Sequence, residues 1–153
     1  MSGVQHLDRI VGFYPRLIIG SPLMCRGEKY ARRHKAYNMI LTGASFIDSK
    51  RAFKRYWGEE AKQGREIVDK LFKCEDVLLN YLYGNATSSS RTVDHVKPAW
   101  AIDASKFFGG AISCNMKVHY RLRSNCLMIF SKICGSIEDR KWEFDSIKYG
   151  WDV

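Results

Sequence analysis

The sequence predicts an α/β domain in which a mixed sheet is flanked by helices. Short apolar runs that end at glycine or proline are typical of strands, and they alternate with longer segments whose apolar residues recur at helical spacing. The 153 residues contain no internal repeat and no linker, and this length is common for one domain. Hydrophobic residues make up 46% of the chain, which is enough for a core.

The predicted strands lie in three places. Residues 9–17 (RIVGFYPRL) read as a buried strand, and residues 36–43 (AYNMILTG) as a second one. Between them, residues 19–35 mix glycine, proline and basic residues, which predicts a loop. Residues 92–103 (TVDHVKPAWAID) alternate like an edge strand that Pro98 interrupts.

Helices are predicted in the intervening segments. Residues 44–60 carry aromatic and aliphatic residues at amphipathic spacing and end near Gly58; they are Phe46, Ile47, Phe53, Tyr56 and Trp57. Residues 59–73 place Ile67, Val68, Leu71 and Phe72 on one face. From residue 74 on, Cys74, Val77, Leu78 and Tyr81 form an apolar stripe that Gly84, then the Ser/Thr run 87–90, ends.

The last third of the chain is less regular. Residues 106–113 contain a glycine pair and read as a mobile loop, and the tail, 142–153, has no clear period. Residues 117–136 run from a short basic segment into an apolar helix.

The formal net charge of +9 favours anionic partners. Nucleic acid, a membrane surface and a phosphorylated small molecule all fit, as does a merely solvated basic surface. The densest basic cluster, residues 25–35, lacks the stacking aromatics and the repeats of a known nucleic-acid module, so we expect no nucleic-acid partner. No apolar run approaches the roughly 20 residues that span a bilayer.

The five cysteines form no CxxC pair, which disfavours a zinc ribbon or a thioredoxin-like site; they are Cys25, Cys74, Cys114, Cys126 and Cys134. Five reduced thiols in a cytosolic protein would satisfy the pattern. The sequon Asn85-Ala86-Thr87 points instead toward a secretory compartment, with Asn85 as an N-glycosylation candidate.

Two constellations could carry chemistry, although the chain lacks a phosphate-binding glycine loop, HExxH and GxSxG. The first is Glu75 and Asp76, which either serve the first turn of a helix or belong to an active site. The second is His119, Arg121 and Arg123, which precede Ser124. Arginine forks match phosphate oxygens, and a helix that starts beside them would add N–H donors; a solvated basic turn is the alternative.

Four motifs then occur in order: VGFYPR (11–16), YNMILTGASF (37–46), CEDVLLNYL (74–82) and HYRLRSNC (119–126). They resemble the exostosin-like glycosyltransferases of family 64. DRIVGFYPRLI (8–18) and VDKLFKCEDVLLNYLY (68–83) are most similar to its plant branch, the glucosamine inositol phosphorylceramide transferases.

The resemblance implies a GT-A fold and a retaining transfer from a UDP-sugar. The sugar would be a hexosamine or N-acetylhexosamine, and the acceptor a glycan or a glycosphingolipid such as inositol phosphorylceramide. It also implies a Golgi membrane protein whose domain faces the lumen, with membrane association only through an N-terminal anchor outside this chain.

The resemblance also assigns residues. Asp76 corresponds to the active-site carboxylate, Arg123 to the arginine that holds the donor diphosphate, and His119 to the lining of the same pocket. Arg16, Leu41, Thr42, Gly43 and Glu75 would face the acceptor. Cys74 and Cys126 would form a disulfide, which leaves Cys25, Cys114 and Cys134 unpaired.

One family feature is missing. The family holds Mn²⁺ through a D-x-D motif placed before VGFYPR, and this chain contains no D-x-D. We therefore expect residues 1–153 to be the C-terminal part of such a domain, without the nucleotide-binding half and inactive alone. The alternative is a non-catalytic fragment that binds or regulates a full-length relative.

Overall fold

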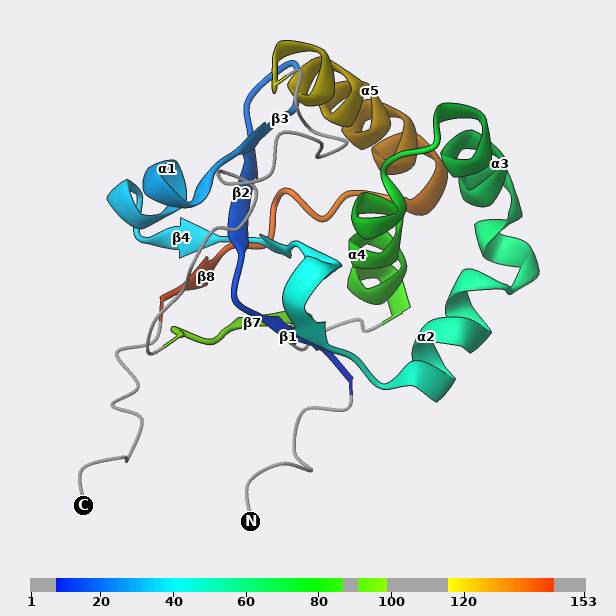
Figure 1. Ribbon diagram of the computed structural model, residues 1–153, viewed down its shortest axis with the longest axis horizontal. Helices are drawn as coiled ribbons and strands as arrows, with labels where there is room; N and C mark the ends of the chain where they lie inside the picture. The colour runs from blue at the N-terminus through cyan, green and yellow to red at the C-terminus, as the bar shows by residue number, and fades with distance from the viewer. Residues whose placement is uncertain (1–7, 87–90, 99–115, 145–153) are drawn as a thin grey trace, which may run out of the picture.

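The computed structural model describes residues 8–86, 91–98 and 116–144. Short strands occupy the middle of the molecule. Figure 1 shows α1 on one side of them, α2, α3 and α4 on the other, and α5 across the top. The prediction of a mixed α/β arrangement flanked by helices is confirmed.

Two three-stranded sheets and one two-stranded sheet form in this part of the chain. In the first, β1 (Ile10–Gly12) pairs antiparallel with β6 (Ser45–Phe46) and parallel with β7 (Val93–His95). In the second, β2 (Pro15–Ile19) pairs antiparallel with β3 (Met24–Arg26) and β5 (Met39–Ile40). The third joins β4 (Ala36–Tyr37) to β8 (Trp142–Glu143).

The helices fall between these strands; they are α1 (Glu28–Arg33), α2 (Ser49–Tyr56), α3 (Lys62–Leu71), α4 (Glu75–Ala86) and α5 (Met116–Cys134). Two 3-10 turns, η1 (Thr42–Ala44) and η2 (Glu59–Ala61), precede β6 and α3. The side chain of Asp48 accepts a hydrogen bond from the Arg51 N–H, so it caps α2 at its first turn. None of the described helices combines the length and apolar character needed to cross a membrane.

Several predicted boundaries are wrong. The strand predicted over 9–17 divides into β1 and β2, because the chain turns between them and continues in another sheet. The loop predicted over 19–35 contains β3 and α1. The strand predicted over 36–43 is two short strands followed by η1. Residues 106–113 and most of the tail lie outside the described residues.

The apolar pattern over 44–60 also misleads. Three of its aromatic side chains, Phe46, Phe53 and Trp57, are more than 60% exposed instead of facing the core. At the end of α3, Phe72 is 91% exposed. Helical spacing places side chains on one face of a helix but does not say whether another element covers that face.

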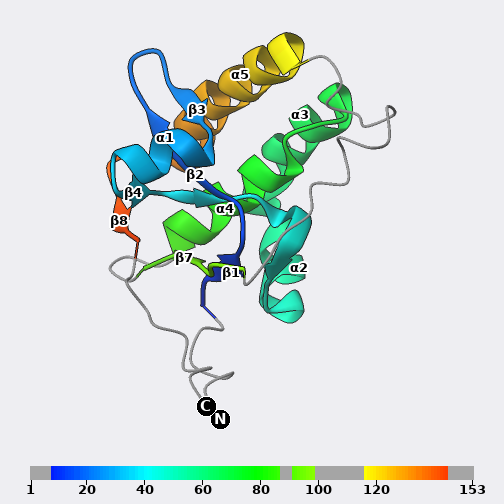
Figure 2. The ribbon, with the colours of Figure 1, turned by 60° about the vertical axis from the view of Figure 1, so that its left-hand side comes forward.

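The stripe predicted over 74–84 is confirmed, because Cys74, Val77, Leu78 and Tyr81 are all buried in the largest core cluster. The helix passes Gly84 and ends at Ala86, directly before the Ser/Thr run of the sequence. A Cβ at Gly84 would lie 2.3 Å from a side-chain carbon of Ile137, so glycine here permits close packing. Figure 2 shows α3 and α4 side by side beneath α5.

A buried asparagine extends the pairing of β2 past the end of β5, along the central strand of the second sheet. The side-chain carbonyl of Asn38 accepts a hydrogen bond from the Ile18 N–H at 2.7 Å, and its NH₂ donates to the Ile18 carbonyl at 3.0 Å. One amide therefore satisfies both backbone groups of a buried residue, as a neighbouring strand would.

Candidate functional site

The carboxylate of Asp76 lies at the first turn of α4, where its two oxygens have different partners. Oδ1 accepts a hydrogen bond from the Val77 N–H at 2.8 Å, and Oδ2 accepts one from Arg123 Nη2 at 2.9 Å. The side chains of Asp76 and Arg123 are only 11% and 12% exposed. One oxygen therefore serves the helix start, and the other holds a buried cation, while a role of Asp76 in an active site stays a prediction.

Arg123 reaches Asp76 from the middle of α5. His119, Arg123 and Cys126 follow at spacings of four and three, which places them on one face of this helix. The expected helix start beside Ser124 is wrong, because α5 begins at Met116 and Ser124 lies in its interior. The backbone N–H groups near Ser124 are hydrogen-bonded within the helix. Donors for phosphate oxygens could therefore come only from the basic side chains at this point. Arg121 is exposed and lies off this face.

A disulfide joins Cys74 to Cys126, as the resemblance implied, with their Cα atoms 6.4 Å apart. It connects the residue before α4 to α5, next to the Asp76–Arg123 pair. The two cysteines are 52 residues apart, and closing a loop of that size stabilises a fold by about 4 kcal/mol in the chain-entropy model. Of the remaining cysteines, Cys25 is free and buried, Cys134 is free and half-buried, and Cys114 lies outside the described residues.

His119 lies beside the pair as a half-buried imidazole. Burial lowers its pKa from the ordinary value, and the cations of Arg123 and Lys73 lower it further, against Asp76 and Glu75. Its Nδ1 is buried and has no hydrogen-bond partner among the described residues. The lowered pKa favours the neutral imidazole at pH 7.

The residues expected to face the acceptor lie on three different elements. Arg16 is half-buried on β2 and donates to the carbonyl of Pro15 at 2.9 Å. Leu41 packs against the core cluster that contains the disulfide, and Gly43 is exposed in η1 beside the half-buried Thr42. Glu75 is exposed at the first turn of α4.

Asn80 connects α4, the helix of Asp76, to the strand that precedes the expected acceptor segment 41–43. The sequence analysis did not single it out. Its side chain accepts a hydrogen bond from the Ile40 N–H at 3.1 Å and donates to the carbonyls of Ile40 and Asp76, each at 2.8 Å. Ile40 directly precedes Leu41. The only signal in the sequence is an amide inside an apolar helical stripe, which indicates a buried hydrogen-bond partner without identifying it.

Cys25 is a second residue that the sequence did not reveal. Burial raises the pKa of its thiol, while the cations of Arg123 and Arg16 lower it and Asp76 raises it. The thiol therefore lies close enough to these three charged groups to respond to each of them. No motif marks it, because a cysteine in a short strand is typical of ordinary packing.

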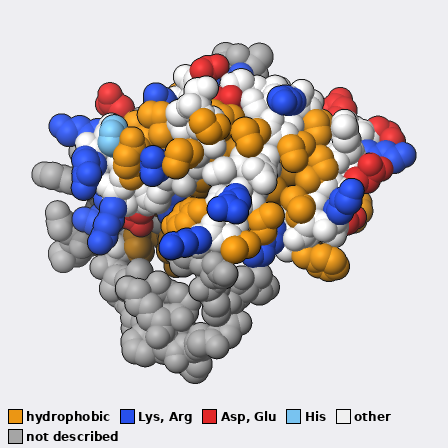
Figure 3. Space-filling view, turned by 90° about the horizontal axis from the view of Figure 1, so that it is seen from above, with side chains coloured by type: hydrophobic (Ala, Val, Ile, Leu, Met, Phe, Trp, Pro, Cys, Tyr) orange, Lys and Arg blue, Asp and Glu red, His pale blue; other side chains and the backbone are white. Residues whose placement is uncertain are grey.

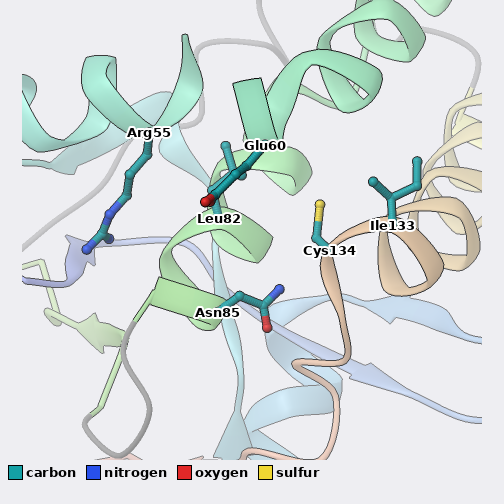
Figure 4. Close-up of a pocket in the computed structure, with 6 residues that line it drawn as sticks. All are labelled: Arg55, Glu60, Leu82, Asn85, Ile133 and Cys134. Atoms are coloured by element: carbon teal, nitrogen blue, oxygen red, sulfur yellow. The ribbon is translucent and has the colours of Figure 1, made fainter. Parts of the chain in front are cut away.

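Asn85, the glycosylation candidate, is exposed at the opposite end of α4 from Asp76. Figure 4 shows its side chain at a cavity of about 300 Å³, across from Cys134. Leu82, Ile133, Arg55 and Glu60 complete the lining. This cavity is separate from the Asp76–Arg123 pair, and Thr87 of the sequon lies outside the described residues.

Comparison with known proteins identifies relatives of the chain. A family model, the glycosyl transferase family 64 domain, matches residues 4–149. The chain is 55% identical over 148 residues to glucosamine inositolphosphorylceramide transferase 1 of Oryza sativa subsp. japonica. It is 52% identical over 150 residues to the protein of that name in Arabidopsis thaliana. Both alignments cover 97% of this chain and 20% of the relative.

A more distant relative is the exostosin-like-3 homolog of Caenorhabditis elegans, 29% identical over 139 residues, which are 86% of this chain and 15% of that protein. The chain thus spans about a fifth of the length of the two plant relatives. Since the family model covers nearly all of its residues, the chain belongs to glycosyltransferase family 64.

Proposed function

We propose that the chain is part of a GT-A type glycosyltransferase that transfers a hexosamine or N-acetylhexosamine from a UDP-sugar, with retention of anomeric configuration. Its acceptor is a glycan or a glycosphingolipid of the inositol phosphorylceramide class, which the names of the plant relatives support. The observation that carries the proposal is the ion pair between Asp76 and Arg123, buried beside the disulfide.

Arg123 holds the donor diphosphate in this proposal. Its guanidinium has five N–H donors, and one of its nitrogens, Nη2, serves Asp76, so donors remain for phosphate oxygens. A fixed cation stabilises the negative charge that grows on the departing nucleoside diphosphate. The neutral imidazole of His119 lies in reach of the same group and adds a hydrogen bond.

Asp76 stabilises the positive charge that develops at the anomeric carbon. Both of its oxygens already accept hydrogen bonds, which favours an electrostatic role over nucleophilic attack. Retention then follows from front-face substitution: the bond from the anomeric carbon to the leaving phosphate oxygen breaks, the acceptor oxygen bonds on the same face, and that phosphate oxygen takes the hydroxyl proton. Arg16, Glu75 and the segment 41–43 contact the acceptor.

The proposal assigns no Mn²⁺ ligand to this chain. The described residues include no group of three histidine, cysteine or acidic side chains that could hold a metal ion, and Asp76 is already paired with Arg123. A disulfide and a sequon suit an oxidising lumen, so we place the domain on the lumenal side of the Golgi membrane.

A chimera tests the proposal. The matching segment of the rice relative is replaced by this chain, and transfer from a UDP-hexosamine to a detergent-dispersed inositol phosphorylceramide acceptor is measured. We expect turnover in the chimera and its loss, by about 100-fold or more, in the Asp76→Asn version. A folded chimera with no transfer, or one that Asp76→Asn leaves fully active, would contradict the proposal and favour a binding or regulatory role.

A further inference from the structure

The outward face of α5 combines apolar side chains with lysine and carries no acid. Lys117, Val118, Met128, Ile129 and Lys132 are all exposed, and their spacing places them on one side of the helix. The whole helix, Met116–Cys134, contains no aspartate or glutamate. Figure 3 looks down on this side and shows hydrophobic side chains interspersed with lysine and arginine, with acids mainly toward the margins.

Phe72 is a further exposed apolar residue, on the turn between α3 and α4 that the disulfide of Cys74 ties to α5. Its side chain is 91% exposed, and its backbone has a φ of 52°, in the left-handed region. Helix α3, which ends just before this turn, packs against α5. A bulky residue in this region is an outlier, and exposing a phenylalanine forfeits the stability that its burial would add.

Neither feature of Phe72 benefits the fold. Glycine or asparagine is the usual residue where a helix ends in the left-handed region, and either would expose less apolar surface. Cys74, two residues later, is also left-handed, with a φ of 77°, and the disulfide holds it there. The turn thus presents Phe72 outward next to the Asp76 helix, at a local energetic cost that calls for a ligand outside the chain.

We propose that Phe72 and the outward face of α5 bind a lipid bilayer surface rich in anionic headgroups. Lysines beside aliphatic and aromatic side chains match such a surface, because the apolar groups enter the interface and the cations face phosphates. The inference rests on the proposed function, since a glycosphingolipid acceptor is presented at a membrane.

The position of the Asp76–Arg123 pair agrees with an orientation in which the outward face of α5 lies on the bilayer. Arg123 and His119 lie on the opposite face of α5 from Lys117 and Met128. A helix with its side chains is about 10 Å across, so a membrane-bound α5 holds Asp76 about one helix diameter from the bilayer surface. An acceptor with a long polar headgroup places its reactive hydroxyl at that depth, whereas the lipid tails stay in the bilayer.

Vesicle flotation of the 153-residue chain tests the proposal. We expect binding to phosphatidylcholine vesicles that contain about 30% phosphatidylinositol, a fraction that gives a strongly anionic surface. Binding to vesicles of phosphatidylcholine alone should be weaker, and added salt should weaken binding to the anionic vesicles. The pair Lys117→Gln and Lys132→Gln should weaken binding by about fivefold for each charge removed. Phe72→Asn should weaken it by about tenfold, because one aromatic anchor is lost.

The matched controls lie on α2, which carries an exposed phenylalanine and lysines of its own. Phe53→Asn, and Lys50→Gln with Lys54→Gln, should leave vesicle binding unchanged. Equal losses of vesicle binding in the α2 variants and in the Phe72 and α5 variants would show that only net charge and hydrophobicity matter, and would overturn the assignment of α5. Failure of the unchanged chain to bind anionic vesicles would also overturn it. Thermal unfolding checks each variant, and Phe72→Asn should keep or raise the melting temperature, since asparagine tolerates the left-handed region.

The outcome is separable from that of the chimera experiment. Vesicle binding needs no donor sugar, and the transfer assay uses a detergent-dispersed acceptor. Transfer without vesicle binding would refute only the proposed membrane-binding surface. Vesicle binding without transfer would refute the proposed activity. In an active chimera, Phe72→Asn should raise KM for acceptor in vesicles and leave kcat with a short-chain soluble acceptor unchanged; an unchanged KM in vesicles would contradict the role of Phe72.

Discussion

Replacing Asp76 by asparagine should reduce both stability and turnover. The change keeps the acceptor for the Val77 N–H but removes the charge and can turn an NH₂ group toward the N–H donors of Arg123. A hydrogen bond to a charged group contributes about 1.5 to 3 kcal/mol, and leaving a buried cation unpaired adds to the loss. Because both side chains are nearly buried, we expect a loss of about 3 kcal/mol, which corresponds to about 6 to 12 °C in melting temperature.

A double-mutant cycle measures the interaction directly. Thermal or urea unfolding is compared for the native chain, Asp76→Asn, Arg123→Met and the double variant, and turnover is measured for the same changes in the chimera. The double variant should be more stable than the sum of the single losses predicts. Additive losses would refute the energetic argument, and an unaffected turnover in Asp76→Asn would return Asp76 to a purely structural place at the start of α4.

Three further predictions follow from the same region. Cys126→Ser should lower the free energy of unfolding by about 4 kcal/mol relative to the oxidised chain, and a reductant should have no further effect on that variant in a urea titration. Asn80→Ala leaves the buried N–H and carbonyl of Ile40 unpaired and should cost about 3 kcal/mol, whereas a loss below about 1 kcal/mol would show that water replaces the amide. Folding lowers the pKa of His119, so the unfolded chain binds its proton more readily and stability should fall as the pH drops below about 6.5; the slope should flatten in His119→Gln.

The sequence predicted the elements whose residues carry a complete local signal. The stripe of Cys74, Val77, Leu78 and Tyr81 repeats at helical spacing directly after a start signal, and α4 forms there. The stop at Gly58 follows from local chemistry in the same way, since α2 ends just before it. The positions of Asp76 and Arg123 came from motif resemblance, because no local rule joins residues 47 apart.

The remaining features depend on tertiary packing, which a pattern does not contain. Glycine, proline and basic residues over 19–35 predict a loop, but the helix α1 forms there, with Ala31 buried and Tyr30 packed partly against the core. The start of α5 was predicted too late in the chain. Its first two turns are basic, and a basic segment lacks the apolar spacing that indicates a helix. Asn80 and Cys25 matter through their neighbours, and a neighbour 40 residues away leaves no trace in the local sequence.

The buried Asn80 has a consequence for aggregation. Asn38 serves Ile18 on the central strand β2, whereas Asn80 occupies the N–H and carbonyl of Ile40 on the outer strand β5, where another chain could otherwise add a strand. A side chain closes such an edge only while its own backbone stays in place. Asn80 belongs to α4, which the disulfide fastens at its start, so a reduced chain in which α4 detaches would expose the edge of β5. Intermolecular strand pairing would then compete with refolding, and loss of the disulfide would appear first as lower solubility.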